Sequence, residues 1–562
     1  MDATTKPDRH AGDTPAAGRS FWLIASALGV AYIAVRVIAW RHTVLVEDTD
    51  SIALLNQVNA WIAGWRAFHV GRMIPPDNTP FYPGLSALLN LPGGSVEFAA
   101  RLCSLLLSLA LFFAVLGLGL RIAEPPAVLA GLAFMTFSPI LIPFSFSVLT
   151  EPSYLGLVYI GLYVFVRQYA APSVASGALL GLIFGLSFLD RTEGILYLAF
   201  IPFVQVVHYW FTRDRSYSSR QLIRWGATFT AVFVLLAAPQ VWRVSRMMGG
   251  FAINGRQAWA LYLGRDLTGE ARDRKLWGLD YSPGEMNIQY IETHPEIRSK
   301  LVSTRSMRDY LAAAARNLTV LYHYALPTMA GAFGIALFAL GIVAIYLRGQ
   351  RFETFLIIAF IANAIAAPIV QNLLLRHVLV LLPLLLLVAG IGAADLVERV
   401  VGEPALQGRW ATVGLALVTG AWVAAETLPL RDAVFYPPTF NREYSRAELE
   451  EPIQIVHRIE REELHRAPIV GARRPYLPWY AHALLVVLPF ADVKGLRTYL
   501  EIHRADLLFL EYSQLANFPM LNDFAGPTAP EGFELLYRKD TATNGRLELY
   551  RVLPSATPAA AR

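Results

Sequence analysis

The sequence contains very little cysteine and little charge. Its one cysteine, Cys103, stands alone among 562 residues, which excludes an intrachain disulfide and a zinc site built from several cysteines. Charged residues make up 16% of the chain, whereas a soluble globular protein carries about a quarter. No block of Lys and Arg with interleaved aromatic residues occurs, so nucleic acid is not expected as a partner. These deficits argue against an ordinary soluble protein.

Long apolar runs stand where the charge is missing. Hydrophobic residues make up 55% of the chain, and many runs approach the ~20 residues that cross a bilayer as a helix. The first run, 21–39, is too long for a signal-peptide core and lacks a clear cleavage site after it, so we expect a retained anchor. The expected membrane helices lie at 21–39, 97–120, 125–145, 152–170, 174–190, 194–211, 222–242, 327–347, 353–370, 378–394 and 410–428.

The basic residues predict how these helices are oriented. If the N-terminal tail, 1–20, is cytoplasmic, every short cytoplasmic connection carries arginine, as the positive-inside rule requires. The opposite orientation would place all of these arginines outside. They are Arg121, Arg167, Arg213, Arg215, Arg220, Arg348, Arg351, Arg399 and Arg409.

Three large soluble parts then lie on the extracytoplasmic side. They are the loops 41–96 and 243–326, and the tail 429–562. Short apolar runs alternate with helical stretches in the tail, which predicts a small α/β domain. The tail has no glycine-rich phosphate loop, so we interpret it as a stabilising cap, with substrate gating or partner recognition as the alternatives. The expected fold is mainly α: a polytopic transmembrane helix bundle over 21–428 with a small C-terminal α/β extracytoplasmic domain.

Three acids follow the first helix within four residues: Glu47, Asp48 and Asp50. Carboxylates crowded beside a membrane repel one another and resist desolvation, which raises a pKa and favours a general base or a cation site. A solvated loop start explains the same pattern, and the spacing leaves both interpretations open. The amphipathic stretch from Ser51 suits a helix lying in the interface, which would hold the acids at headgroup depth.

Glu151 is an isolated acid at the expected extracytoplasmic start of the 152–170 helix. A carboxylate at this depth needs a partner or a function, although capping of the helix by Glu151 or Thr150 is equally compatible. A turn between two apolar runs carries Arg191 and Glu193. Ion pairing within the turn explains part of this cluster, and Arg191 also suits a phosphate ligand.

Arg376 and His377 begin the 378–394 run on the same side of the membrane. Arginine offers planar donors for bidentate binding of phosphate. Snorkelling of the side chain to lipid headgroups is the alternative, but an extracytoplasmic arginine runs against the charge rule and favours a function. His377 is included only because it is the residue next to Arg376. Four separate stretches of chain thus bring acids and arginines to one membrane face.

The sequence resembles the polytopic GT-C class of glycosyltransferases. Within this class it is most similar to the bacterial dolichyl-phosphate-mannose-like protein mannosyltransferases and the lipid A aminoarabinose transferase. The resemblance rests on an ordered set of motifs along most of the chain. They are the acids Glu47 and Asp48, TPFYPG at 79–84, AARLCS at 99–104, Glu151, RTEG at 191–194, RHVLVLLP at 376–383 and the tail motifs that end in LYRVLP. Tyr82 and Arg101, which lie in two of these motifs, join the expected substrate-binding residues.

The resemblance implies an extracytoplasmic transfer of sugar from a polyprenyl-phosphate donor to a lipid, glycan or protein acceptor, in the inner membrane of a bacterium. Many relatives have Asp-Glu in the first loop where this chain has Glu-Asp-Thr-Asp, so Asp48 is the favoured base and Glu47 and Asp50 are alternatives. Such a base would accept the proton of the acceptor hydroxyl, and the transfer would invert the anomeric centre.

The same implied reaction gives the other site residues their roles. Arg376 and Arg191 would stabilise the leaving phosphate, and Glu151 would orient the sugar or the acceptor. A divalent cation between Asp48 and Glu151 is compatible with the pattern, although no complete ligand set is present. The helical stretch 293–318 resembles the juxtamembrane helices of the class and would cover the donor site, unless it lies on the surface without touching substrate.

Two other classes of protein fit parts of the pattern. A transporter or flippase of an envelope lipid or glycan typically has repeated halves and broken helices with polar groups at mid-membrane. Here no repeat is visible, and the polar groups gather at one face. An assembly factor for envelope polysaccharide is the second alternative, in which the acids are merely solvated.

Overall fold

The structure is a computed structural model. It describes residues 18–43, 49–66, 79–211, 217–248, 251, 253, 307–370, 375–402, 409–435, 446–489, 491–512, 515, 518, 520–541 and 545–554. The chain forms two compact units. The helical unit comprises Met1–Thr43, Gln57–Arg243 and Arg305–Pro437, and the second unit comprises Val44–Asn56, Val244–Thr304 and Pro438–Arg562. Two helices, α2(Thr49–Arg66) and α10(Ser219–Met248), have residues in both units.

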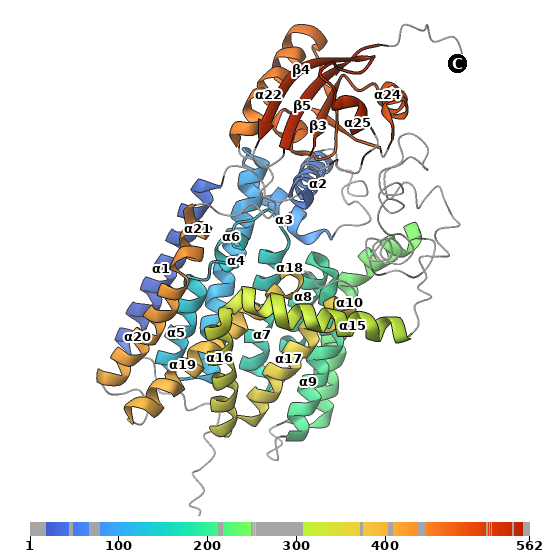
Figure 1. The fold of residues 1–562 in the computed structure, drawn as a ribbon. Helices are drawn as coiled ribbons and strands as arrows, with labels where there is room; N and C mark the ends of the chain where they lie inside the picture. Colours follow the sequence, from blue (N-terminus) through green and yellow to red (C-terminus); the bar gives the residue numbers. More distant parts are fainter. Residues whose placement is uncertain are drawn as a thin grey trace, which may run out of the picture. The chain divides into compact units, whose positions relative to one another are not determined.

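Most helices of the helical unit are apolar and run side by side, whereas the more polar α15(Met307–Val320) lies across the others (Figure 1). In chain order they are α1(Arg19–His42), α3(Phe81–Leu89), α4(Val96–Ile122), α5(Pro125–Thr136), α6(Leu141–Phe144), α7(Glu151–Gln168), α8(Val174–Asp190), η2(Thr192–Leu196), α9(Tyr197–Phe211), α15(Met307–Val320), η3(Leu321–Ala325), α16(Leu326–Leu347), α17(Arg351–Val370), α18(Leu375–Val378), η4(Leu379–Leu381), α19(Leu382–Val401), α20(Arg409–Ala425) and α21(Thr427–Phe435).

All eleven apolar segments expected from the sequence contain helix. Within the described residues, seven helices are long and apolar enough to cross a membrane, and the bent pair formed by α20 and α21 brings the number to eight. The other three segments correspond to α5, α7 and α8. The polytopic membrane fold predicted from hydropathy is confirmed.

The prediction of one continuous helix at 125–145 is wrong, because the structure has two separate helices there, α5 and α6. The break falls around Pro139. Proline lacks the amide donor of a helix interior, and it disfavours helical geometry at the residue before it, Ser138. Instead, the Ser138 hydroxyl accepts the backbone N–H of Leu141 and starts α6.

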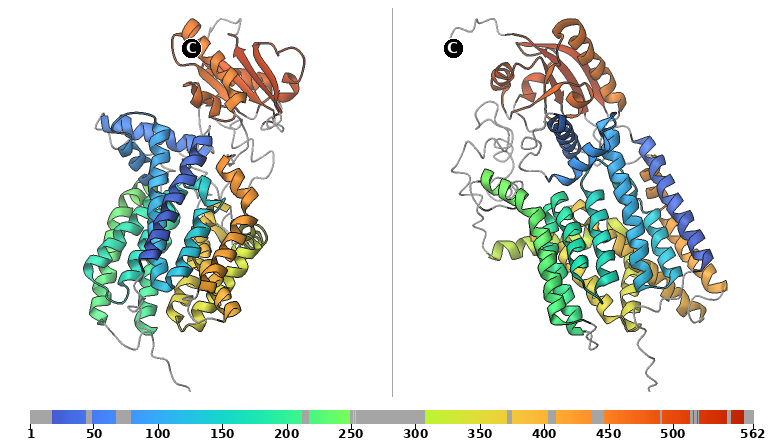
Figure 2. Two further views of the ribbon diagram at one scale, coloured as in Figure 1. Left: turned by 90° about the vertical axis from the view of Figure 1, so that its left-hand side faces the viewer. Right: turned by 180° about the vertical axis from the view of Figure 1, so that it is seen from behind.

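Helix α19 lies at the centre of the helical unit, and 94% of its most apolar stretch is buried. Two of its glycines make this central position possible. A Cβ added at Gly390 would collide with the backbone of Gly131 in α5, and one added at Gly392 would collide with the carbonyl oxygen of Leu337 in α16. The helix backbones therefore touch directly, as small residues allow in membrane bundles. On another side of the unit, α1 packs beside α5 and α21 (Figure 2).

The C-terminal part of the second unit is a mixed five-stranded sheet with the order β2-β1-β3-β5-β4. Strands β1(Ile469–Ala472), β2(Leu484–Val487) and β3(Leu507–Glu511) are parallel, whereas β5(Gly545–Val552) is antiparallel to β3 and to β4(Phe533–Thr541). Four helices, α22(Arg446–Ile459), α23(Tyr476–Tyr480), α24(Val493–Ile502) and α25(Leu521–Phe524), and one π-helical turn, η6(Glu460–Leu464), complete it. The small α/β domain expected from the alternating tail is confirmed.

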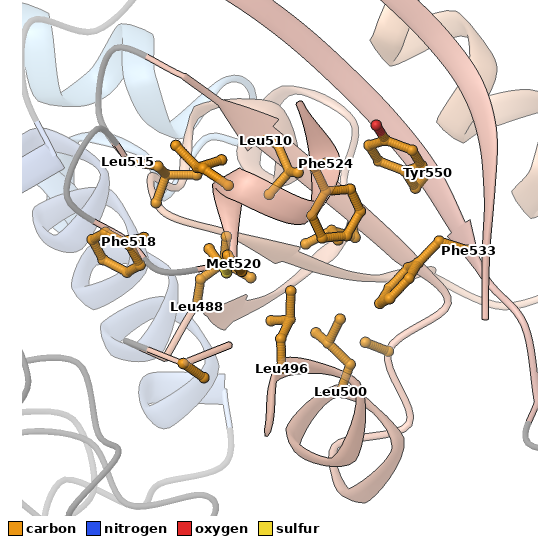
Figure 3. Close-up of a cluster of buried hydrophobic side chains, with 14 residues drawn as sticks. Leu488, Leu496, Leu500, Leu510, Leu515, Phe518, Met520, Phe524, Phe533 and Tyr550 are labelled. Carbon is orange, nitrogen blue, oxygen red and sulfur yellow. The ribbon is translucent and has the colours of Figure 1, made fainter. Parts of the chain in front are cut away.

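The core of this domain lies between the sheet and α24. Figure 3 shows Leu496 and Leu500, which come from α24, pointing into the same cluster as Phe524 and Tyr550. The two leucines are four residues apart and so lie on one face of the helix. Every residue of β3 is buried, which explains why this central strand is an almost continuous apolar run in the sequence.

Candidate functional site

A small polar pocket lies within the helical unit, where four separate segments of chain meet. Its charged lining comes from the start of α7, from Arg191 directly after α8, from Glu193 in η2, and from α18. The lining residues are Glu151, Tyr154, Leu155, Arg191, Glu193, Ala364, Arg376, His377 and Val380. Five residues that the sequence predicted to bind substrate are thus brought together: Glu151, Arg191, Glu193, Arg376 and His377.

Glu151 is the first residue of α7, and Pro152 follows it in the first turn. Proline suits this position because the first amides of a helix have no partner within the helix. The carboxylate therefore sits at the positive end of the helix dipole, which stabilises its charge. It is only 3% exposed, so it needs a cationic partner as well.

Arg191 supplies that partner. Its Nη1 donates to Oε1 of Glu151 at 2.5 Å, and its Nη2 donates to Oε1 of Glu193 at 3.2 Å. Burial alone would lower the pKa of Arg191, but the charges of Glu193 and Glu151 raise it above its usual value. The aromatic ring of Tyr154 lies 5.8 Å from the guanidinium. Arg191 is therefore a fixed cation held between two acids.

Arg376 approaches the same carboxylate oxygen from another element. Its Nε lies 4.0 Å from Oε1 of Glu151, and its side chain is 24% exposed. One oxygen of Glu151 thus stands between the guanidinium groups of Arg191 and Arg376. Two guanidinium groups that converge on one oxygen form an arrangement suited to an oxyanion such as phosphate.

The turn that carries Arg191 and Glu193 is packed tightly against the end of α8. A Cβ added at Gly194 would lie 2.5 Å from the backbone nitrogen of Phe188. The backbone N–H of Gly194 also donates to the carbonyl of Arg191. Only glycine allows this close approach, and the approach fixes where the two charged side chains begin.

Tyr82 and Arg101, which the sequence placed among the substrate-binding residues, lie outside this pocket. Tyr82 is fully buried, and its hydroxyl donates to the carbonyl of Ala100 at 2.9 Å. Arg101 is 2% exposed; it pairs with Glu97 at 3.0 Å and donates to the carbonyl of Phe146 at 3.4 Å. Arg101 therefore holds the segment that leads to Glu151, and a direct role in substrate binding remains a prediction for both residues.

Of the three expected catalytic acids, Asp50 lies within the described residues. Glu47 and Asp48 lie outside the described residues, as does the 293–306 part of the expected covering helix. Asp50 is half-buried in the first turn of α2 and belongs to the second unit. Within the described residues no group of three His, Cys, Asp or Glu side chains is suited to hold a metal ion.

Sequence analysis missed two neighbours of Glu151. Tyr154 lies three residues further along α7 and lines the pocket. Ser153 donates to Oδ2 of Asp190 at 2.6 Å. The helical spacing of Glu151 and Tyr154 places them on one face, so this contact could have been found. No sequence signal connects Ser153 with Asp190.

Comparison with known proteins identifies the fold. No protein-family model and no curated protein matches the sequence, but solved structures do. The chain is similar to the archaeal oligosaccharyltransferase AglB from Archaeoglobus fulgidus in complex with an inhibitory peptide and a dolichol-phosphate, with TM-score 0.58 and 11% identity over 94% of this chain and 74% of that one. A structure of the Archaeoglobus fulgidus oligosaccharyltransferase with Zn and sulfate gives TM-score 0.57 and 13% identity over 93% and 72%.

ArnT from Cupriavidus metallidurans in the apo state is also similar, with TM-score 0.51 and 12% identity over 94% of this chain and 97% of that one. These structural neighbours are GT-C glycosyltransferases. The chain has their polytopic fold, as its sequence motifs led us to expect.

Proposed function

We propose that this protein is a membrane glycosyltransferase that moves a sugar from a polyprenyl-phosphate donor to an extracytoplasmic hydroxyl group. One observation carries the proposal: Arg191 and Arg376 converge on a single carboxylate oxygen of Glu151 in a pocket at the ends of membrane helices. A pocket with two such cations suits the phosphate of a lipid at headgroup depth. The GT-C fold is consistent with this chemistry, although a fold alone does not determine a function.

The donor phosphate would lie between Arg191 and Arg376. As the bond from the anomeric carbon to the phosphate oxygen breaks, both electrons of that bond stay with the phosphate. The two guanidinium groups would stabilise this charge where it develops, which lowers the barrier more than binding the donor alone would. Glu151, Glu193 and His377 would orient hydroxyl groups of the sugar or the acceptor.

The acceptor needs a base on the other side of the anomeric carbon. Asp48 would take the proton of the acceptor hydroxyl as its oxygen forms the new bond, with Glu47 and Asp50 as alternatives. Because the acceptor attacks opposite the leaving phosphate, this direct displacement inverts the configuration.

The partners of this reaction follow from its chemistry. The donor is a polyprenyl-phosphate-linked sugar, and the acceptor is a lipid, a glycan or a protein outside the cytoplasm. The AglB structure contains a dolichol-phosphate, which supports a lipid phosphate as the carrier. We further propose a location in the bacterial inner membrane, with a cytoplasmic N-terminus and an extracytoplasmic α/β domain.

A comparison of envelope glycans from cells with and without the gene would identify the product, and Asp48→Asn would then test the base. We expect the variant to insert at the wild-type level and to lose sugar transfer. Unchanged transfer in Asp48→Asn together with loss in Glu47→Gln or Asp50→Asn would move the base by one or two residues. Unchanged transfer with altered translocation of an envelope lipid would instead support a transporter or flippase.

Asp395→Asn is a matched control for these experiments. Asp395 is a buried aspartate near the end of α19, where Arg399 donates to it at 2.7 Å. It lies 13 residues beyond the start of α19 at Leu382, or about 20 Å along the helix. Its substitution removes a buried carboxylate without touching the pocket, so transfer should continue.

A further inference from the structure

Asp190 is a buried acid that the proposed chemistry does not use. It is the last residue of α8 and is fully buried. Its Oδ2 accepts the hydroxyl of Ser153 at 2.6 Å, whereas its Oδ1 has no hydrogen-bond partner in the described part of the chain. Removing a carboxyl group from water is costly unless hydrogen bonds replace the lost hydration. Because the Ser153 hydroxyl and the nearby backbone amide of Tyr82 replace only part of that hydration, this side chain calls for an explanation.

Asp190 joins three segments that would otherwise be independent. Ser153 belongs to the first turn of α7, two residues after Glu151. The hydroxyl of Thr79 donates to the main-chain carbonyl of Asp190 at 2.5 Å. The backbone amide of Tyr82, at the start of α3, faces the carboxyl group. The beginnings of two helices are therefore fastened to the end of a third.

These contacts define the separation of Arg191, which would hold the phosphate, and Glu151, the carboxylate with which it pairs. Asp190 is bonded covalently to Arg191, and its side chain holds the turn of α7 that begins with Glu151. Arg191 in turn donates to Glu151. The path from Asp190 through Ser153 to Glu151 and back through Arg191 is a closed loop of short contacts. A shift at Asp190 would change the distance between Glu151 and Arg191.

We propose that Asp190 is a positioning residue of this site: by holding the first turn of α7 to the end of α8, it sets the relative positions of Arg191 and Glu151 for a lipid phosphate. The inference rests on the proposed function. Asp190 itself touches no substrate, because it is fully buried behind the pocket lining.

The test measures equilibrium binding of a radiolabelled polyprenyl phosphate to the purified full-length protein in detergent. We expect Asp190→Ala to raise the Kd about tenfold, which corresponds to the loss of one buried hydrogen bond. Asp190→Asn keeps a side-chain oxygen for Ser153 and should remain within about threefold of the wild type. Asp395→Ala, which removes a buried aspartate elsewhere, should leave the Kd unchanged.

A double-mutant cycle separates positioning from general damage to the fold. If Asp190 acts through Arg191, Asp190→Ala should add little further loss of binding in an Arg191→Gln background, because coupled residues are not additive. An equal loss in both backgrounds, or no loss from Asp190→Ala, would overturn the inference. If Asp190→Ala does not fold, Ser153→Ala takes its place in the same cycle. Absence of binding by the wild type would overturn the proposed function, which is a distinct result.

Discussion

Replacing Glu151 with glutamine should tighten the binding of a bare polyprenyl phosphate. In the pocket, Oε1 of Glu151 stands between Arg191 and Arg376, where a phosphate oxygen would be held. The carboxylate therefore competes with the ligand for both cations. Glutamine keeps the shape of the side chain and a carbonyl oxygen, but it removes the negative charge that a phosphate must displace or tolerate.

The size of the effect follows from Coulomb's law. Two unit charges about 5 Å apart interact by roughly 3 kcal/mol at an effective dielectric constant of about 20. Water reaches part of the pocket because the Arg376 side chain is 24% exposed, which screens the repulsion. A gain of about 1.4 kcal/mol is a realistic lower figure, so we expect the Kd to fall roughly 10- to 100-fold.

The measurement is equilibrium binding of a radiolabelled polyprenyl phosphate to purified protein in detergent, at two salt concentrations. Glu193→Gln is the matched control, because Glu193 also pairs with Arg191, at 3.2 Å, whereas Glu151 pairs with both Arg191 and Arg376. It should tighten binding less. Sugar transfer by Glu151→Gln should decline, because the spent carrier leaves slowly and one group that orients the sugar is altered. Equal or weaker binding by Glu151→Gln would refute the competition and with it the assignment of the phosphate position.

The remaining predictions concern three other residues. Arg376→Lys should weaken binding of the same lipid about tenfold in that assay, because lysine lacks the planar fork of donors; an unchanged Kd would exclude Arg376 from the phosphate site. Gly194→Ala should lower both the thermal unfolding temperature and the transfer rate, since its Cβ would lie 2.5 Å from the Phe188 nitrogen; unfolding in detergent measures the first effect, and wild-type values would show that the turn adapts. Burial raises the pKa of Glu511 well above 4.5, so the neutral form is favoured in the folded state. Glu511 should therefore stabilise the fold fully at a pH below its unfolded pKa, where it is neutral in both states. As the pH rises through the folded pKa, this stability should be lost, and the free energy of unfolding should fall by about 1.4 kcal/mol for each pH unit that separates the two pKa values. Unfolding temperatures of wild type and Glu511→Gln measured across this range should therefore converge at low pH and separate as pH rises, and parallel curves would contradict the prediction.

Much of the fold could be predicted because a bilayer imposes simple rules on sequence. Apolar runs of sufficient length mark the helices, and arginines at the ends of these runs, such as Arg121 and Arg167, predict an orientation for them. The break at Pro139 is an exception to these rules. The apolar run extends past this proline, so hydropathy alone predicts one helix. Proline has no backbone N–H to donate, however, and the helix ends there.

Those residues of the candidate site that are isolated charges within apolar runs could be predicted from the sequence. Glu151 and Arg376 stand out because each lies among apolar residues, and the alternation of helix direction places both at one membrane face. Which partners they choose was not predictable. The pairing of Arg191 with Glu151 as well as with Glu193 depends on the three-dimensional packing of α7 against α8. The burial of Tyr82 and Arg101 likewise depends on packing, since polar groups in a motif look alike whether they face substrate or hold the chain.

The direct backbone contacts of Gly390 and Gly392 limit how this protein can respond to a ligand. Because α19 is locked against α5 and α16 at two levels, it cannot rotate or slide without separating main chains that already touch. Arg376 precedes α19 by only a few residues, yet the short turn η4 and the non-helical backbone of Val378 interrupt the helix between them. The backbone that carries Arg376 is thus not a rigid continuation of α19, whereas the centre of the bundle is fixed by direct main-chain contacts.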